Sequence, residues 1–372
     1  MPEIHSARRA RVQEQLSKFG VDAALITNGV NVRYLTGLVS SNAAVLLPAS
    51  GEAKLATDAR YLGTAERDCY DLELLNERDV AEVLVSEALL GGLSSIGFED
   101  RDLTVKRHQA LVDLEDPEEG AGHPPLELVP LGGLLDELRM VKDDTEIELI
   151  AQACQITGQA FSQMLEMLRP GVTERQYAIA LERAMVDLGA EGPAFSTIVA
   201  SGPHGAIGHH VPTDRPFQIG DLVTVDCGAK VQGYHADMTR TVAIGEPADW
   251  QREIYDLVAE AQAAGRAAAR VGAELADVDA AARDLISAAG HGDYFTHGLG
   301  HGVGLLIHEA PFLAANETGT LQDRVPLTIE PGIYLAGAGG VRIEDTLVVR
   351  AGTGAAGSAQ SLTTITRELL VL

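Results

Sequence analysis

The first 135 residues alternate between two patterns of apolar positions. An amphipathic, mostly polar stretch extends to about Gly20, and short apolar runs follow at residues 23–27, 43–47 and 54–57. Amphipathic stretches that alternate with short apolar runs are typical of helices packed on strands. We therefore predict an α/β domain in this part of the chain.

The chain changes character between residues 113 and 143. Residues 113–125 are rich in proline, glycine and charge, which predicts an exposed loop near the end of the first domain. Apolar positions then recur at helical spacing from 133 to about 168, and Asp143 with Glu146 indicates a helix start. We place an N-terminal domain at residues 1–139 and a C-terminal domain at residues 140–372.

The C-terminal domain groups its helices apart from its strands. Helical spacing occurs at residues 173–188 and in two alanine-rich stretches between 250 and 289. Strand patterns occur at 195–200, in a hairpin at 222–244 and through about the last eighty residues, where 352–357 predict a surface turn. Helices segregated from antiparallel strands indicate an α+β domain.

Composition and charge narrow the set of partners. The 372 residues include 54 acidic and 28 basic side chains, a formal net charge of −26, and 46% of them are hydrophobic. That apolar content can fill ordinary cores and excludes wholesale disorder. The acidity argues against a nucleic acid partner, because binding a polyanion requires a basic surface.

Neither secretion nor membrane insertion is predicted. The chain has no run of 18 apolar residues, and its charged start lacks the apolar core of a signal peptide. Three cysteines, an odd number without C-x-x-C spacing, support neither a disulfide framework nor a thiolate zinc site. We expect a cytoplasmic, reduced protein without a membrane partner.

Two strand-like runs around Gln232-Gly233 carry a pair of carboxylates. Residues 222–242 predict an antiparallel hairpin, in which Asp226 and Asp237 lie opposite or diagonal on one face. Their carboxylates would then be roughly 5 to 8 Å apart. Like charges so close need a shared proton or a cation; the alternative is a solvent-exposed hairpin face.

A second hairpin repeats this arrangement. Glu330 and Glu344 lie in strand-forming apolar runs on either side of a turn centred near Gly337, which brings them face to face. Unpaired buried carboxylates are very costly, so their burial requires compensation. Two such hairpins in one chain indicate a common acidic site.

Three histidines lie in a glycine-rich run between the two hairpins. His297, His301 and His308 lie in a run whose glycines allow the backbone to approach a ligand closely. The run fails as a dinucleotide fingerprint, since strand-like residues follow it, and as a zincin motif, since Phe312 stands where the second histidine is required. On a regular strand His301 and His308 would face opposite ways, so a shared site needs a bulge. The alternative is a turn with structural histidines.

Charge balance then suggests a metal centre. Asp226, Asp237, Glu330 and Glu344 would be balanced by two divalent cations, with the neutral imidazole of His301 as a fifth ligand. Oxygen-rich ligation favours manganese, with zinc, cobalt or iron as alternatives. Two metals about 3.5 to 4 Å apart can share a bridging hydroxide, which makes hydrolysis the natural chemistry.

This constellation resembles the five-ligand pattern of the pita-bread metallopeptidases. The five positions are separated by 11, 64, 29 and 14 residues. The strings at residues 198–203, 209–215, 298–304 and 341–346 are similar to those of the proline-peptidase branch, aminopeptidase P and prolidase, and the likeness covers essentially the whole chain. It implies a pita-bread catalytic domain preceded by a smaller α/β creatinase-like domain.

The resemblance also implies metal-binding roles. Asp226 would chelate one metal, His301 and Glu330 would hold the other, and Asp237 with Glu344 would bridge both. The cofactor would be two divalent ions per chain, manganese first, with zinc or cobalt as alternatives.

Four residues receive catalytic roles from the same resemblance. Glu330 would pass the proton of the attacking water, His209 and His308 would contact the scissile region, and His297 would lie near the prime side. Gly208 stands where the family usually has a proline, which leaves the placement of His209 less defined.

Neighbouring residues would support the site. Arg342 and Tyr334 match positions that hold the ligands in place. His204 and His210 are assigned structural or solvated roles.

Substrate length separates the two enzymes of this branch. Aminopeptidase P cleaves peptides with proline in second position, whereas prolidase accepts only Xaa-Pro dipeptides and reads their carboxylate, normally with an arginine on a loop. We recognise no such loop, and Asp58, Arg60 and Tyr61 form a string that resembles small bacterial aminopeptidases P. We predict a Xaa-Pro aminopeptidase with these three as specificity residues, and prolidase as the alternative. For Asp58 and Arg60, a strand-end ion pair is the other interpretation.

Proteins of other classes share this fold. Metal-free peptide-binding or histone-binding modules and creatinase lack the full ligand set, which is present here. The resemblance further implies a homodimer.

Overall fold

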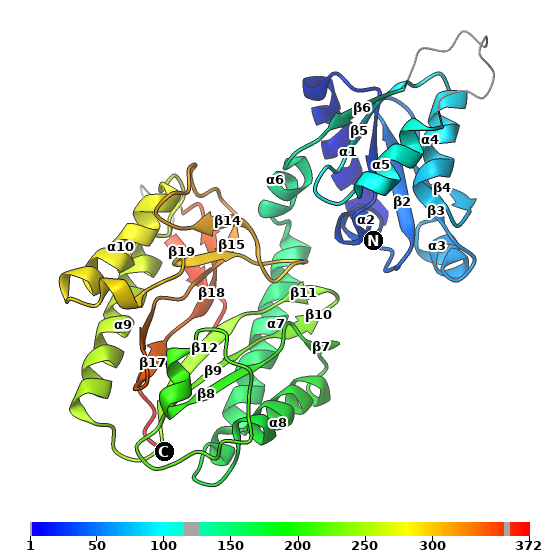
Figure 1. Ribbon diagram of the computed structural model, residues 1–372. Coiled ribbons are helices and arrows are strands. Elements are labelled where there is room, and N and C mark those ends of the chain that lie inside the picture. Colours follow the sequence, from blue (N-terminus) through cyan, green and yellow to red (C-terminus); the bar gives the residue numbers. More distant parts are fainter. Residues whose placement is uncertain (1, 115–125, 353–357) are drawn as a thin grey trace. The chain divides into compact units, whose positions relative to one another are not determined.

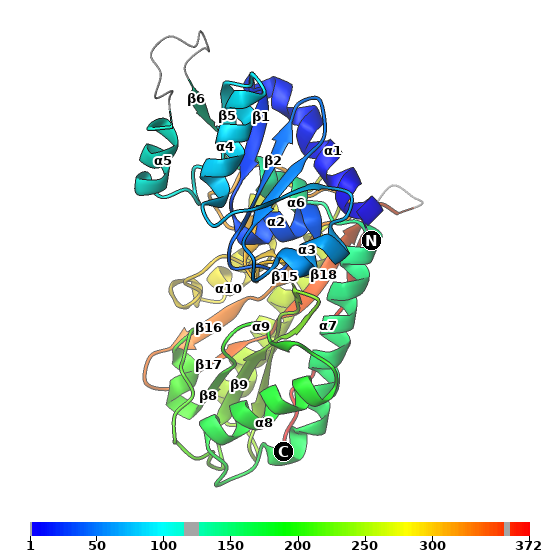
Figure 2. The same cartoon turned by 90° about the vertical axis from the view of Figure 1, so that its right-hand side faces the viewer.

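The computed structural model describes residues 2–114, 126–352 and 358–372. Most of the loop predicted at 113–125 and of the turn predicted at 352–357 lies outside these residues. The chain divides into two compact units, Met1–Arg139 and Met140–Leu372. Figures 1 and 2 show the helices and strands of both units from two sides.

The first unit is a mixed six-stranded sheet with helices. Its strands are β1 (Ala23–Ile26), β2 (Ala43–Pro48), β3 (Lys54–Thr57), β4 (Glu73–Asn76), β5 (Ser95–Phe98) and β6 (Glu127–Pro130). Its helices are α1 (Pro2–Phe19), α2 (Gly29–Thr36), α3 (Leu62–Asp68), α4 (Val80–Leu90), α5 (Val105–Val112) and α6 (Leu134–Met140). The strand order is β4-β3-β2-β1-β5-β6, with β1 parallel to β5 and antiparallel to β2. The predicted α/β character is confirmed.

Helices and antiparallel strands are segregated in the second unit, as predicted. Its helices are α7 (Asp144–Gln163), η1 (Leu165–Met167), α8 (Glu174–Asp187), η2 (Gly202–Ala206), α9 (Asp249–Ala268), α10 (Leu275–Ala288) and η3 (Gly292–Tyr294). Its strands are β7 (Gly192–Pro193), β8 (Ile198–Ser201), β9 (Leu222–Cys227), β10 (Ala229–Val231), β11 (Tyr234–His235), β12 (Met238–Ala243), β13 (Gly300–Gly302), β14 (Glu309–Leu313), β15 (Pro326–Ile329), β16 (Gly332–Leu335), β17 (Gly339–Arg342), β18 (Asp345–Arg350) and β19 (Ser358–Ser361). The sheets have the orders β12-β9-β8, β11-β10-β7, β14-β13-β15-β18-β19 and β16-β17.

Local sequence explains where the helices begin. Asp143 caps α7 and forms a capping box with Glu146, so the helical pattern that starts at residue 133 is interrupted between α6 and α7. Thr173 caps α8 in the same way with Gln176. Predicted helix boundaries therefore agree with the structure to within a few residues.

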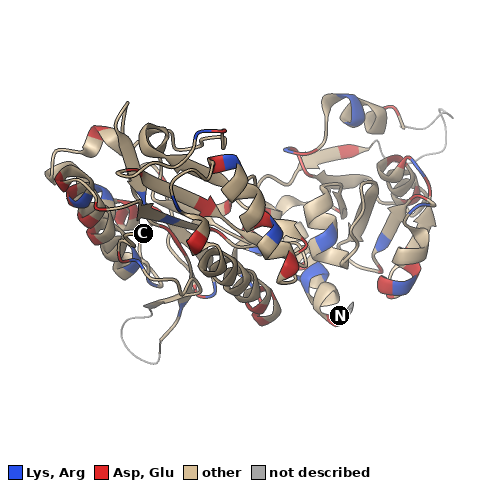
Figure 3. Cartoon of the chain, turned by 90° about the horizontal axis from the view of Figure 1, so that it is seen from below, with Lys and Arg blue, Asp and Glu red and all other residues tan. Residues whose placement is uncertain are grey.

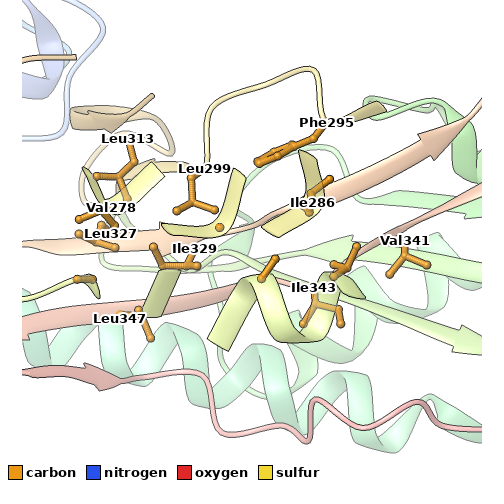
Figure 4. Packing of buried hydrophobic residues seen from close by; sticks show 14 of the residues in the cluster. Val278, Ile286, Phe295, Leu299, Leu313, Leu327, Ile329, Val341, Ile343 and Leu347 are labelled. Carbon is orange, nitrogen blue, oxygen red and sulfur yellow. The ribbon is translucent and has the colours of Figure 1, made fainter. Parts of the chain in front are cut away.

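One hydrophobic core joins α9 and α10 to the strands of the second unit. Val278 and Ile286 of α10 pack in a cluster with Leu299, Leu327 and Ile329 (Figure 4). Burial of such side chains stabilises the fold by roughly 1.5 to 3 kcal/mol each. The core thus supports β13, which contains His301, and β15, which Glu330 directly follows.

Acidic positions occur on helices and loops of both units, with basic positions interspersed among them (Figure 3). This distribution accompanies the net charge of −26. Within the described residues, no helix combines the length and apolar character needed to cross a membrane.

Candidate metal centre and catalytic cavity

The first hairpin places two aspartates diagonally. Asp226 of β9 pairs with Thr239 of β12, so Asp237, two residues earlier, lies diagonal to Asp226. Gln232 and Gly233 both have positive φ, 44° and 80°, as a two-residue hairpin turn requires. Of the two registers that the sequence allowed, the structure forms the diagonal one.

The second hairpin brings two glutamates together. Ile329 of β15 pairs with Asp345 of β18, and Gly332 of β16 pairs with Arg342 of β17 in the same register, so Glu330 and Glu344 lie between these two pairs. Thr239 joins the two hairpins, because its hydroxyl donates to Oε2 of Glu344 over 2.7 Å. All four candidate carboxylates therefore come from two adjoining hairpins.

The glycine-rich run brings two histidines together. The pairing of β13 with β14 shifts between His301 and Gly302, and the rings of His301 and His308 lie 4.3 Å apart between centroids. The bulge that a shared site requires is thus formed. The nearby glycine serves a different purpose from the one expected, because a Cβ on Gly300 would overlap the carbonyl oxygen of Thr328 rather than a ligand. Glycine there allows two strands to approach.

A compact group of possible ligand atoms results. Asp237, His301 and Glu344 each offer an atom within 4.8 Å of the others. The Nε2 atom of His301 lies 3.3 Å from Oε1 of Glu330 and 3.7 Å from Oδ2 of Asp237. Nδ1 of His301 lies 3.0 Å from the carbonyl oxygen of Gly302, so Nδ1 carries a proton and Nε2 is the nitrogen that lies toward Glu330 and Asp237.

Unsatisfied carboxylate oxygens show that this group fits a divalent cation. Oδ1 of Asp226 and Oε1 of Glu344 are buried and have no hydrogen-bond partner among the described residues. Burial and the charge of Glu344 raise the pKa of Asp237 well above its usual range, and burial with the charge of Glu330 does the same for Glu344. A cation bound by these oxygens would relieve both the burial and the repulsion.

His301 and Glu330 form a mutually stabilising pair within the group. Burial alone would lower the pKa of His301, but the hydrogen bond and charge of Glu330 raise it. Burial alone would raise the pKa of Glu330, but the hydrogen bond and charge of His301 lower it to about 2. Glu330 is therefore ionised at neutral pH.

Arg342 links one candidate ligand to its surroundings. Its guanidinium donates to Oδ2 of Asp226 over 2.7 Å, to the Tyr334 hydroxyl over 2.9 Å and to the Thr239 hydroxyl over 3.1 Å. Arg342 itself is 3% exposed. Its charge offsets one of the buried carboxylates, and its planar fork orients Asp226.

His297 uses both of its ring nitrogens inside the protein. Nδ1 lies 2.8 Å from the carbonyl oxygen of Gly298, and Nε2 lies 2.8 Å from the Tyr334 hydroxyl. Because Arg342 donates to that hydroxyl, the tyrosine proton is directed to His297. Burial also lowers the pKa of His297. His297 also lines the cavity that holds the candidate ligands, and its role near the prime side stays a prediction.

Two other histidines line the cavity and are exposed. His209 and His308 belong to a cavity of about 760 Å³ that also contains the five candidate ligands. Burial and the charge of His301 lower the pKa of His308. The residue after His308, Glu309, forms a buried ion pair with Lys142. The turn that carries His308 is thus anchored to the start of the unit.

The rest of the cavity wall is largely apolar. Its apolar side chains include Phe195, Val211, Ile307 and Phe312. Among the described residues that line the cavity, the positively charged Lys or Arg side chain is that of Arg342, which is already bonded to Asp226. A substrate's carboxylate would therefore meet histidines and apolar groups here.

The three specificity candidates lie in the first unit and bond to one another locally. Arg60 binds the Asp58 carboxylate through two nitrogens, at 2.9 and 2.7 Å, and its guanidinium lies over the Tyr61 ring. The hydrogen bond from Arg60 lowers the pKa of Asp58. Tyr61 also bonds to the Ser41 hydroxyl at 2.8 Å. These contacts are those of a strand-end ion pair.

Some residues of the site escaped sequence reasoning. Thr239 and the ion pair of Lys142 with Glu309 carry no motif, and Glu174 follows a capping threonine like any first-turn acid. His204 and His210 both bond to Glu174, so they are structural rather than solvated. Only the fold reveals these partners, because they are far apart in the sequence.

Comparison with known proteins matches both units to families. Residues 148–351 match metallopeptidase family M24, and residues 8–141 match the creatinase/prolidase N-terminal domain. A protein named Xaa-Pro dipeptidase from Pyrococcus furiosus is 34% identical over 370 residues, which cover 96% of this chain and 99% of that protein.

Solved structures of two kinds of proline peptidase are similar to this chain. A Xaa-Pro dipeptidase from Bacillus anthracis has a TM-score of 0.91 at 34% identity, covering 99% of this chain and 100% of that one. An X-Pro aminopeptidase from Thermotoga maritima has a TM-score of 0.87 at 33% identity, covering 98% of this chain and 99% of that one. The similarity thus extends over the whole length in both cases.

Proposed function

Because the chain belongs to metallopeptidase family M24, in the proline-peptidase branch of the pita-bread fold, we propose that it hydrolyses the bond between a first residue and a following proline. The fold expected from the sequence, a creatinase-like domain followed by a pita-bread domain, is confirmed by these matches. One observation carries the proposal above the others. Asp226 and Glu344, which line the cavity together with His301, each have a buried carboxylate oxygen without a hydrogen-bond partner among the described residues.

We propose Asp226, Asp237, His301, Glu330 and Glu344 as the ligands of two divalent ions, manganese first. When bound, such ions would polarise the scissile carbonyl and make water a nucleophile at neutral pH. The donor set of four carboxylates and one imidazole suits manganese, with zinc or cobalt as alternatives.

Proton transfer falls to Glu330 in this proposal. Glu330 lines the cavity beside the other candidate ligands. Thr328 donates to Oε1 of Glu330 over 3.2 Å, which orients the group and leaves Oε2 to receive a proton. An ionised carboxylate at the cavity wall can therefore accept the proton of an attacking water.

His209 and His308 would act on the substrate. Both are exposed in the cavity wall, and the lowered pKa of His308 keeps its ring neutral near pH 7. A neutral ring with an N–H can donate a hydrogen bond to charge that develops on the scissile group. The apolar wall beside them, including Val211 and Phe312, would contact the ring of proline.

Dipeptides are the substrate class that we propose first. The Pyrococcus furiosus and Bacillus anthracis relatives are both named Xaa-Pro dipeptidases. The sequence alone favoured an aminopeptidase, and the relatives lend more support to its alternative.

A second candidate, removal of the first residue from longer peptides, also has an observation in its favour. Prolidase normally reads a carboxylate with an arginine, but Arg342 in this cavity is bonded to Asp226 and Tyr334. The peptide chain that follows proline in a longer substrate could then extend beyond the apolar wall of the cavity. The Thermotoga maritima structure named X-Pro aminopeptidase fits this candidate.

Two matched substrates test the proposal. Hydrolysis of an Ala-Pro dipeptide and an Ala-Pro-Ala tripeptide is measured with manganese and after removal of metal. Metal-dependent cleavage of either peptide at the bond before proline supports the peptidase, and the faster peptide assigns the class. Equal cleavage of peptides with alanine in place of proline would contradict it.

Assembly and specificity follow from the same family resemblance. We propose that Asp58, Arg60 and Tyr61 contribute to substrate selection and that the chain forms a homodimer. Substitution of Arg60 by alanine should then change the ratio of dipeptide to tripeptide cleavage.

A further inference from the structure

A buried carboxylate lies beneath the loop that carries His209. Glu174, the first residue of α8, has an exposure of 0%. Its Oε1 atom accepts hydrogen bonds from the backbone and hydroxyl of Ser201, at 2.9 and 2.7 Å, and contacts Nδ1 of His204 at 2.9 Å. Its Oε2 atom accepts from the backbone and hydroxyl of Thr213, at 3.0 and 2.7 Å, and contacts Nε2 of His210 at 2.9 Å.

This cluster has the residue types of a metal site, but its bonding argues against one. Glu174, His204 and His210 offer atoms within 4.8 Å of one another. However, three donors already surround each oxygen of Glu174, which leaves no lone pair for a cation. The guanidinium of Arg215 also lies 2.6 Å from the Ser201 hydroxyl and would repel one.

The partners of Glu174 bracket His209 in the sequence. Ser201 and His204 precede it, and His210 and Thr213 follow it, so one carboxylate ties both ends of the loop. Such convergence on a single group defines the path of the backbone between the ends.

The ring of His209 differs from the rings of His204 and His210, which both contact Glu174. Among the described residues none makes a hydrogen bond to that ring, whose residue is exposed in the cavity wall. The carbonyl oxygen of Gly208 accepts a bond from Arg342 at 3.3 Å, and the ring of His210 is tied to Glu174. The backbone that carries His209 is therefore held on both sides, and its path limits where the His209 ring can reach.

We propose that Glu174 is a positioning residue that holds His209 in the catalytic cavity through His204 and His210. The proposal rests on the proposed function, in which His209 contacts the substrate. Glu174 touches no substrate atom in this account. It acts by keeping the neighbouring backbone in the one geometry that presents His209 to the scissile group.

His204 and His210 are placed to hold the loop that carries His209. Their rings lie 4.4 Å apart between centroids and are tilted by 35°, so they pack against each other while both contact the same carboxylate. A glutamine at position 174 would replace one acceptor oxygen by an NH₂ group, which would face donors instead. Glu174→Gln therefore breaks the network at nearly constant volume.

Hydrogen exchange tests the structural half of the proposal without any need for activity. In Glu174→Gln we expect faster exchange in residues 202–213 than in the parent protein. The matched control is Glu146→Gln, since Glu146 is 2% exposed and bonds to the Asp143 backbone at 2.9 Å and the Tyr234 hydroxyl at 3.0 Å. Unchanged exchange in 202–213, or the same change in both variants, would overturn the proposal.

A double-mutant cycle with His209→Ala tests the functional half. Glu174→Gln should lower kcat by about 10- to 100-fold, with bound metal unchanged. In the His209→Ala background the same change should lower kcat by less than about twofold, because the two residues act as one unit. An equal loss in both backgrounds would show general structural damage and would overturn the proposal.

A second pair of variants guards against misfolding of Glu174→Gln. His210→Ala should lower kcat in the same direction, and His210→Gln, which keeps an N–H donor, should restore part of it. If the parent protein cleaves no Xaa-Pro peptide, the proposed function fails while the exchange measurement still decides whether Glu174 orders the loop. The two failures are thereby separated.

Discussion

Arg342 donates a hydrogen bond to Oδ2 of Asp226 over 2.7 Å, while Oδ1 of the same carboxylate is buried without a partner among the described residues. Arg342 therefore fixes Oδ2 of Asp226, and Oδ1 remains able to bind a cation. Metal ligands commonly have this arrangement, in which a neighbouring donor orients the carboxylate and the other oxygen can bind the ion.

Replacing Arg342 by lysine tests this arrangement. Lysine keeps the charge but cannot contact Asp226, Tyr334 and Thr239 through one planar fork. We expect metal affinity to fall by about 10- to 100-fold, measured by titration of the metal-free protein with manganese. Arg175→Lys is the control, because the Arg175 pair with Asp214 is exposed and far from the ligands in the sequence. Equal affinities in parent and Arg342→Lys would contradict the prediction.

Asp237→Asn should separate function from stability. Removing this carboxylate should abolish metal-dependent hydrolysis and lower the bound metal. The metal-free variant should nevertheless be more stable than the metal-free parent, by about 1 to 2 kcal/mol, because burial and the charge of Glu344 disfavour the ionised aspartate. Thermal unfolding of both proteins in chelator measures the difference. A lower melting temperature for the variant would count against repulsion in the empty centre.

The buried ion pair of Lys142 with Glu309 predicts a large effect on stability. Both side chains are nearly inaccessible, at 1% and 3% exposure. Lys142→Met removes the positive charge beside the buried Glu309 carboxylate, which should lower the free energy of unfolding by about 3 to 5 kcal/mol. Combining it with Glu309→Gln should recover part of this loss. Arg252→Met, which breaks an exposed pair with Glu246, should change stability by less than about 1 kcal/mol.

The lowered pKa of Glu174 predicts how the stability of the protein depends on pH. Burial alone would raise its pKa, but hydrogen bonds from His210, Thr213 and Ser201 lower it from 4.5 to about 2. A depressed pKa in the folded state contributes stability above pH 4.5 that is lost as the pH falls toward 2. The contribution is on the order of 3 kcal/mol. Unfolding free energies of the parent and Glu174→Gln should differ most above pH 5 and converge near pH 2. A constant difference across this range would refute the assignment.

Each pair of carboxylates could be predicted from the sequence because hairpin register is a local property. The Gln232-Gly233 turn determines which residues face each other, and alternation of side chains then places Asp226 and Asp237 on one face. The same reasoning brings Glu330 and Glu344 together, since they lie between the pairs Ile329–Asp345 and Gly332–Arg342 of one register. Turn chemistry and a period of two act over a few residues, so the chain encodes them without reference to its fold.

The preferred length of the substrate could not be predicted from local sequence patterns. The string at Asp58, Arg60 and Tyr61 favoured an aminopeptidase, whereas the structure shows these side chains bonded to one another. Short strings are weak guides here, because an aspartate two residues before an arginine forms an ion pair whatever the function.

Contacts between residues that are far apart in the sequence follow from the fold rather than from a local sequence pattern. Thr239 bonds to Glu344 across 105 residues, Lys142 meets Glu309 across 167, and Glu174 reaches His210 across 36. These contacts depend on how hairpins, helices and loops pack, and packing is set by the whole core rather than by any local pattern. Local patterns thus identify residues whose chemistry suits metal binding, whereas the packing of distant segments brings Thr239 and Arg342 into contact with them.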